Sequence, residues 1–158
     1  MSEFMEISLC TKADFDQILR DIADFWGDER TLAVHHPMFL YEFGNSAYVM
    51  KEGDLVVGYL FGVLSQTEIV AYVHLLGVRR SHQRQGIARR LYEHFIDFAR
   101  ENGYQEIKAI TSPNNKISIA FHRRMGMELL GEQGEKGIPV IKNYSGPGIH
   151  RVIFYKRI

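Results

Sequence analysis

The chain has 158 residues, which is short enough for one domain, and its hydrophobic content of 46% argues against disorder. The 19 Lys and Arg residues balance the 19 Asp and Glu residues, so no net charge would draw the protein onto nucleic acid or a membrane. The single cysteine cannot form an internal disulfide, and no stretch resembles a secretion signal or a membrane-spanning helix. We therefore expect one domain over residues 1–158, located in the cytoplasm.

Hydrophobic periodicity predicts the elements of the first half of the chain. In chain order they are a strand at 4–10, a helix at 11–27, a shorter helical segment within 29–43, a β-hairpin at 46–65 and a strand at 68–78. Thr11 is the expected N-cap of the first helix and Gly27 its stop, whereas Pro37 interrupts or begins the shorter segment. The hairpin turns at Glu52-Gly53-Asp54.

The second half alternates helices and strands. In order we expect a helix at 86–102, a strand at 104–112, a helix at 114–126, a strand at 127–131 and a final strand at 148–158. The pair Asn102-Gly103 is a typical helix end. Residues 132–148 form a loop punctuated by Gly and Pro, and long loops in compact domains are often functional. This order describes a mixed α/β or α+β sheet protein.

The hinge between the strand at 68–78 and the following helix has the composition of an anion site. The first N–H groups of a helix lack intrahelical partners and carry a partial positive charge, so they favour phosphate. Gly86 removes the side chain where a ligand would touch this backbone. Five arginines surround it, namely Arg79, Arg80, Arg84, Arg89 and Arg90.

Two common phosphate loops do not fit this hinge, because no Gly-Lys pair precedes Ser or Thr and only one glycine is present. The pattern that is present, Gln83-x-x-Gly86-x-Ala88, resembles motif A of the GCN5-related N-acetyltransferases, the GNAT family. Downstream, Asn115-x-x-Ser118-x-x-Phe121-His122-x-x-x-Gly126-Met127 resembles motif B of the same family. The resemblance covers roughly residues 45–130.

The resemblance implies a GNAT-like α/β (α+β) fold, with a mostly antiparallel sheet flanked by helices and splayed between its fourth and fifth strands. The implied cofactor is acetyl-CoA, with its coenzyme A portion in that splay and its pyrophosphate on the motif A loop. The residues implied to contact it are Leu76, Gly77, Val78, Gln83, Arg84, Gln85, Gly86, Ile87, Ala88, Asn115, Ser118 and Phe121. Backbone amides of Leu76–Val78 would pair with the pantetheine arm, and one would polarise the acetyl carbonyl.

Several of these residues also have a purely structural interpretation. Gly86 could be no more than the glycine that begins a helix, and Gln83 could be a solvated hinge residue. Arg84 is the better candidate for a phosphate contact, because a guanidinium binds phosphate oxygens in bidentate fashion. Asn115 is an excellent N-cap, and capping does not exclude a hydrogen bond to the cofactor.

Three residues are candidates for proton transfer. The family usually has a tyrosine where this chain has His122, and an imidazole could also protonate the departing thiolate. His74 and Tyr72 share one face of their strand, where family members often place a glutamate base that is absent here. A base matters because an amine with a pKa of ~10.4 is almost wholly protonated at pH 7. Each histidine could instead be structural.

The acceptor side is expected from the first helices and the long loop. Candidates to line it are Trp26, His35, His36, Tyr41, Tyr144 and Ser145. The adjacent pair His35-His36 does not indicate a metal site, because consecutive side chains point apart and no third ligand lies nearby in sequence.

The sequence therefore predicts an acetyl-CoA-dependent N-acetyltransferase that acetylates the primary amine of a small molecule or amino-acid-like acceptor by direct attack. The alternatives are a catalytically weak coenzyme A sensor and an acetyltransferase for protein N-termini or lysines. We expect neither a nucleic-acid nor a membrane partner, although the basic stretch at residues 79–90 keeps a nucleic-acid binder as a rival. An exposed final strand would let two copies pair as a homodimer.

Overall fold

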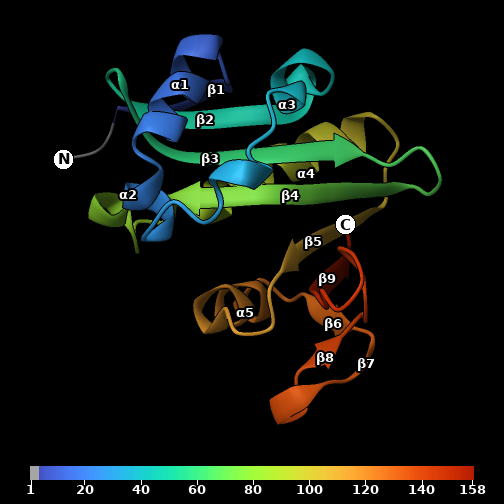
Figure 1. Cartoon of the computed structure of the whole chain (residues 1–158). Coiled ribbons are helices and arrows are strands. Elements are labelled where there is room, and N and C mark those ends of the chain that lie inside the picture. The colour runs from blue at the N-terminus through green and yellow to red at the C-terminus, as the bar shows by residue number, and fades with distance from the viewer. Residues whose placement is uncertain (1–3) are drawn as a thin grey trace. The chain divides into compact units, whose positions relative to one another are not determined.

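A computed structural model describes residues 4–158, so the first three residues of the expected domain lie outside the description (Figure 1). The helices are α1 (Lys12–Arg20), α2 (Ile22–Trp26), α3 (Met38–Tyr41), α4 (Ile87–Glu101) and α5 (Lys116–Arg124). The strands are β1 (Met5–Leu9), β2 (Ala47–Glu52), β3 (Leu55–Leu64), β4 (Val70–Val78), β5 (Glu106–Thr111), β6 (Glu128–Leu130), β7 (Glu132–Gln133), β8 (Pro139–Val140) and β9 (Val152–Arg157). Short 3₁₀ turns lie at Leu32–Val34, Gly44–Ser46, Arg80–His82 and Glu135–Gly137.

Seven strands pair in the order β1-β2-β3-β4-β5-β9-β6, and β7 pairs with β8 in a small separate sheet. The β4–β5 pair is parallel, whereas the pairs β1–β2, β2–β3, β5–β9 and β6–β9 are antiparallel. The parallel register runs from Val70↔Glu106 to Val73↔Ala109, and β4 continues beyond it to Val78. This mixed, mostly antiparallel sheet with flanking helices confirms the predicted fold class.

The chain divides into two compact units, Met1–Val63 with His74–Phe98 and Leu64–Val73 with Ala99–Ile158. The boundary runs through β4, so each unit combines distant parts of the sequence. The single domain expected from the chain length stays a prediction.

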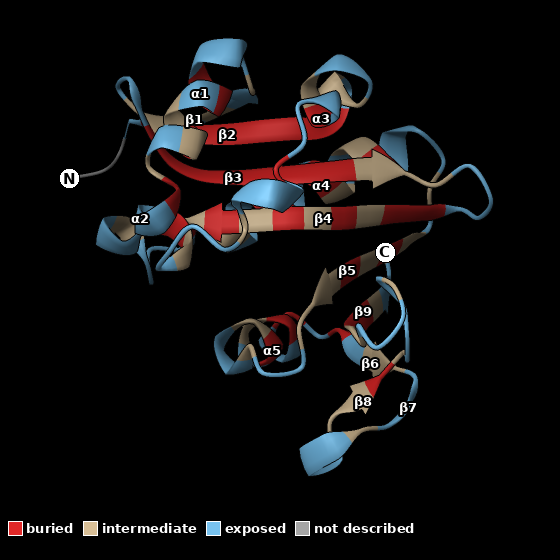
Figure 2. Ribbon diagram, viewed as in Figure 1, coloured by how far each residue is buried: buried red, intermediate tan, exposed pale blue. Residues whose placement is uncertain are grey.

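In the first unit, helices cover both faces of the sheet. Alternate residues of each strand point to opposite faces, so neighbours such as Tyr48 and Val49 enter different cores. Val49 belongs to a core with Phe15 of α1 and Phe25 of α2. Tyr48 contacts the ring of Phe95 on α4, 6.2 Å away between centroids. Figure 2 shows the resulting band of buried residues along β2 and β3.

Helix α4 lies close to the sheet because β3 carries a glycine beneath it. A Cβ at Gly58 would approach Ile87 Cγ2 to 2.5 Å and Leu91 Cδ1 to 3.3 Å. Both side chains are fully buried. The glycine therefore sets how closely the start of α4 approaches the sheet.

In the second unit, α5 packs on β9. The ring of His122 on α5 stacks on Phe154 of β9, with 4.0 Å between centroids, and Lys156 Nζ donates to the carbonyl oxygen of Met125. Strand β9 lies between β5 and β6. The expectation that the final strand is exposed and could pair two copies is therefore wrong, because both of its edges are already hydrogen-bonded.

Two other local predictions need correction. The helix expected at 11–27 divides at Asp21, whose carboxylate accepts from Arg79 Nη2, 3.1 Å away. The interruption also lets Asp24 reach the same guanidinium, at 3.0 Å. The loop at 132–148 contains the two-residue strands β7 and β8, which no apolar pattern marks. None of the helices within residues 4–158 is long and apolar enough to cross a membrane.

Candidate functional site

The anion loop begins at an anchored arginine. Arg79 is buried, and its Nε donates to the carbonyl oxygen of Val56 while its two terminal nitrogens donate to Asp21 and Asp24. Its guanidinium also lies 4.8 Å from the ring centroid of Phe25. Arg79 therefore fixes the end of β4 against α1 and α2, and its charge is already compensated.

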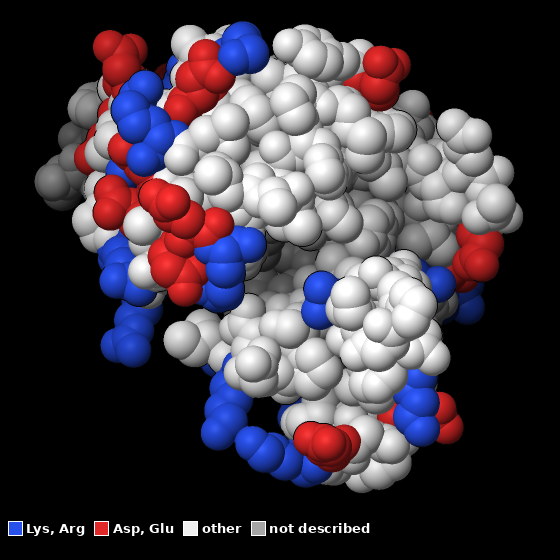
Figure 3. Space-filling model, in the orientation of Figure 1, with Lys and Arg blue, Asp and Glu red and all other residues white. Residues whose placement is uncertain are grey.

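The arginines of the basic stretch have different surroundings. Arg79 is internal, and Arg90 on α4 directs Nη2 to the carbonyl oxygen of Met5, 3.3 Å away. Arg84 and Arg89 are exposed. Figure 3 shows acidic and basic side chains interleaved over the region of α1 and α2. The buried Arg79 is therefore unavailable to a phosphate backbone, which removes one arginine from the basic surface that the nucleic-acid rival needs.

The turn before the loop is tied to the β2–β3 hairpin. His82 places Nε2 3.2 Å from Glu52 Oε1 and Nδ1 2.7 Å from Ser81 Oγ. The turn that leads into the loop is therefore held at both ends, by Arg79 and by His82.

The loop itself has the backbone of an anion cradle. Arg84 and Gly86 both have left-handed backbone conformations, with φ of 63° and 79°. Alternation of left- and right-handed residues turns successive N–H groups toward one point and forms a concavity that suits anions. A Cβ built on Gly86 meets nothing within 4 Å. The chain therefore leaves open space at the position where a ligand would need to touch the backbone, next to the first turn of α4.

The end of β4 rests on a buried aromatic network in the same unit. A Cβ at Gly77 would lie 2.8 Å from Tyr59 Cε1, so this position accepts only glycine without rearrangement. Tyr59 is fully buried, and its hydroxyl accepts from Trp26 Nε1 at 2.6 Å. The same hydroxyl lies 2.7 Å from His35 Nε2. The carbonyl oxygen of Thr31 can only accept, so His35 Nδ1 carries the hydrogen and donates to it, and Nε2 of the neutral ring accepts from the Tyr59 hydroxyl.

This network gives a structural role to His35 and Trp26, two residues that the sequence analysis assigned to the acceptor side. His35 is buried, and burial lowers its pKa, so the ring is neutral, as the network requires. Trp26 is half-buried with its indole nitrogen committed to Tyr59. His36 and Tyr41 are exposed. His74 on β4 stacks on Phe39 of α3, with 5.3 Å between ring centroids.

The motif B residues lie together on α5, in the second unit. Asn115 caps the helix, and its Oδ1 accepts from the backbone N–H of Ser118 at 3.1 Å, which confirms the capping interpretation. Phe121 and His122 lie edge to face, with 5.2 Å between centroids.

His122 is buried and neutral. Burial lowers its pKa to about 4, although the hydrogen bond to the carbonyl oxygen of Ser118 opposes that shift. Nδ1 lies 2.7 Å from that oxygen, which can only accept, so Nδ1 carries the hydrogen. The second ring nitrogen is then an acceptor.

Tyr72, the third candidate for proton transfer, lies in the second unit with the long loop. Burial raises the pKa of Tyr72, the neighbouring Tyr144 raises it to a smaller degree, and Arg151 opposes the shift. Tyr72 is therefore a neutral phenol rather than a base. Arg151 and Tyr59 were not singled out from the sequence, because both owe their place to residues far away in the chain.

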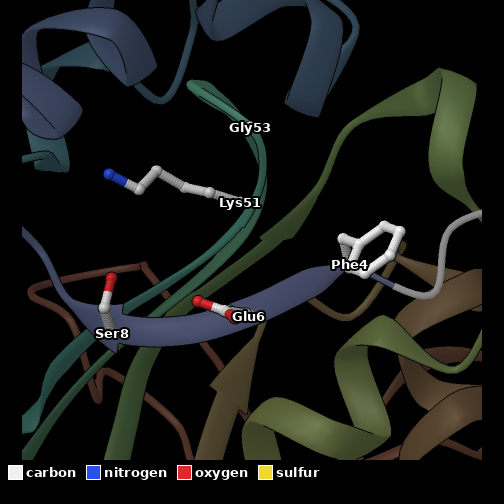
Figure 4. Close-up of a pocket in the computed structure, with 5 residues that line it drawn as sticks. All are labelled: Phe4, Glu6, Ser8, Lys51 and Gly53. Carbon is white, nitrogen blue, oxygen red and sulfur yellow. The ribbon is translucent and has the colours of Figure 1, made fainter.

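A separate shallow pocket lies at the outer edge of the sheet. Phe4, Glu6, Ser8, Lys51 and Gly53 line it, and Figure 4 shows Glu6 and Ser8 projecting from β1. Lys51 is already paired with Asp14 at 3.2 Å. None of the residues predicted to bind a cofactor lines this pocket. Among residues 4–158, no group of three His, Cys, Asp or Glu side chains could hold a metal ion.

Comparison with known proteins points to one family. The profile of the acetyltransferase (GNAT) family matches residues 13–127. The L-methionine sulfoximine/L-methionine sulfone acetyltransferase of Salmonella typhimurium is 27% identical over 148 residues, which are 85% of this chain and 86% of that protein. The N-alpha-acetyltransferase RimI of Mycobacterium tuberculosis is 33% identical over 84 residues, which cover 51% of each protein.

Solved structures share the fold. Ard1 from Thermoplasma volcanium has a TM-score of 0.77 at 17% identity, covering 98% of this chain and 97% of that one. The acetyltransferase yncA from Salmonella typhimurium, solved with its cofactor acetyl-CoA, has a TM-score of 0.65 at 21% identity, covering 97% and 93%. At these identities the likeness concerns the fold alone.

Proposed function

The chain belongs to the GNAT acetyltransferase family, and we propose that it transfers the acetyl group of acetyl-CoA to the primary amine of a small-molecule acceptor by direct attack. The observation that carries the proposal is the loop Gln83–Ala88, with its left-handed Arg84 and Gly86 and the open space at Gly86. A relative that acts on methionine derivatives and covers most of both chains supports an amino-acid-like acceptor.

The loop fits the pyrophosphate of coenzyme A. The N–H groups at the start of α4 offer donors to an anion, and Gly86 allows close approach. The exposed guanidinium of Arg84 and the amides of Gln83 and Gln85 add donors beside them. Ile87 is buried, so it and Ala88 contribute backbone rather than side chain.

Bound acetyl-CoA would supply a thioester, whose carbonyl carbon the neutral amine attacks as the C–S bond breaks; the nitrogen loses one proton to solvent, and the thiolate that leaves takes one up. A backbone N–H of Leu76, Gly77 or Val78 would donate to the carbonyl oxygen as negative charge develops on it. The packing of Gly77 on Tyr59 holds this backbone in one place. Holding the amine and the thioester close together in the correct orientation supplies much of the rate enhancement.

The roles of His122, His74 and Tyr72 in proton transfer remain proposals to be tested by substitution. Asn115, Ser118 and Phe121 remain proposed cofactor contacts. If His122→Ala leaves turnover unchanged, His122 is structural, as its stacking on Phe154 supports.

The test measures thiol release from acetyl-CoA with the purified full chain across a panel of amines, amino acids and peptides. Turnover with small amines or amino acids supports the proposal, and turnover restricted to peptides supports the protein acetyltransferase alternative. Binding of acetyl-CoA without turnover of any amine would indicate a sensor. Gly86→Glu, which fills the open space at the loop, should abolish binding.

A further inference from the structure

The loop between β8 and β9 in the second unit is held by its own hydrogen bonds. A bridge between Ile141 and Arg151 closes it. Within it, Asn143 has a left-handed conformation, and its Oδ1 accepts from the backbone N–H of Gly148 at 2.7 Å. The N–H of Asn143 donates to His150 Nδ1 at 2.9 Å. The loop therefore presents its side chains in a preorganised arrangement.

Two phenols meet at this loop. Tyr144 is 46% exposed, and it lies near enough to Tyr72 on β4 to raise the pKa of that phenol. A phenol both donates and accepts, so the partly exposed Tyr144 and the half-buried Tyr72 offer polar groups beside the loop.

Arg151 brings an unneutralised positive charge to the same place. Its Nε donates to Ser145 Oγ at 3.0 Å, and its charge acts on the phenol of Tyr72. Within residues 4–158, no carboxylate forms an ion pair with it. Arg79, by contrast, pairs with both Asp21 and Asp24. In Arg151 only Nε is engaged by Ser145, and the terminal N–H groups of the guanidinium form the fork that matches a carboxylate.

We infer that Arg151, together with the hydroxyls of Tyr72 and Tyr144, binds the carboxylate of a free amino acid as the acceptor. The inference rests on the proposed acetyltransferase function and names its substrate class. A protein N-terminus has an amide where a free amino acid has its carboxylate, so this site favours free amino acids over protein acceptors.

The experiment compares each proteinogenic L-amino acid with its amide and its decarboxylated amine as acceptors for the purified full chain. At least one amino acid should have a KM lower than that of its amide by about tenfold or more, as one charge-assisted bidentate contact would give. Arg151→Met should raise the KM of the amino acid by a similar factor and leave that of the amide unchanged. Arg151→Lys should fall between, because lysine keeps the charge but loses the fork.

Arg157→Met is the matched control, since it removes an exposed positive charge from β9 in the same unit and should leave both KM values unchanged. Thermal unfolding of each variant shows whether it is folded. Equal KM values for amino acid and amide, or no effect of Arg151→Met on a folded protein, would overturn the inference while leaving the acetyltransferase function standing. Absence of turnover with every amine would overturn both.

Discussion

Two glycines at opposite ends of α4 offer a matched test of the anion loop. Gly86 precedes the helix with φ of 79°, and Gly103 follows it with φ of 82°. A Cβ on either residue meets nothing within 4 Å. Alanine at either position must therefore adopt the same left-handed backbone without a clash, at a cost of roughly 1–2 kcal/mol.

The two alanine variants should lose similar stability but differ in acetyl-CoA binding. For a chain of this length, each kcal/mol lowers the Tm by roughly 2–4 °C. Gly86→Ala also places a methyl group where the pyrophosphate would approach the backbone. Losing one hydrogen bond to a charged group costs about 1.5–3 kcal/mol, which raises the Kd for acetyl-CoA by roughly 10–100-fold.

Calorimetric titration with acetyl-CoA and thermal unfolding of both variants provide the measurements. Gly103→Ala should bind acetyl-CoA as the parent protein does, despite its lower Tm. Equal Kd values for the two variants would refute the assignment of Gly86 to the cofactor loop, and an unchanged Tm for both would refute the strain argument.

Three further predictions follow from the packing. Below about pH 6.5 the unfolded chain protonates His122 while the folded ring, with a pKa of about 4, stays neutral, so the free energy of unfolding should fall by up to about 3 kcal/mol toward pH 4. In denaturant titrations His122→Phe should remove that part of the acid sensitivity, whereas substitution of the exposed His36 by Gln should not. If the unfolding free energy of the parent protein and of His122→Phe changed with pH at the same slope, burial of a neutral His122 would be contradicted. Gly77→Ala should lower the unfolding free energy by about 1–3 kcal/mol by overpacking against Tyr59, with Tyr59→Leu relieving part of the loss in a double variant; unchanged urea midpoints would contradict the close contact. Asn143→Ala should raise the KM of the acceptor several-fold but not that of acetyl-CoA, because the loop loses its internal hydrogen bonds; parallel changes in both would speak against a role confined to the acceptor.

Strand β4 was predictable because burial alternates along it. On β4 the residues from Ala71 to Val78 alternate between buried and half-buried, as the apolar pattern required. The break between α1 and α2 was not predictable, because its cause lies in Arg79, which is 58 residues from Asp21. Apolar spacing reports which face of a helix is buried but not where a distant guanidinium interrupts it.

Some residues of the candidate site were likewise predictable from local sequence, and others depend on distant contacts. Gly86 and the cap at Asn115 depend on local backbone geometry, and short sequence patterns carry that information. The partner of His35 Nε2 is the distant Tyr59 hydroxyl, and the availability of Arg151 to an acceptor depends on the absence of a carboxylate partner within residues 4–158. Such properties belong to the folded arrangement, so no spacing in the sequence predicts them.

The protonation states bear on how the reaction would manage its protons. A thiol such as that of coenzyme A has a pKa of ~8.5, so a departing thiolate needs little help from an acid near neutral pH, and a neutral His122 is no obstacle. The amine is the harder problem, with a pKa of ~10.4 when it resembles lysine. A guanidinium that binds the acceptor carboxylate also places a positive charge near the ammonium group, and a like charge lowers the pKa of that group. Arg151 would then serve both to hold the acceptor and to favour its reactive form, which reduces the demand for a carboxylate base on β4 and leaves the acceptor's own ionisation to govern the acid limb of the pH profile.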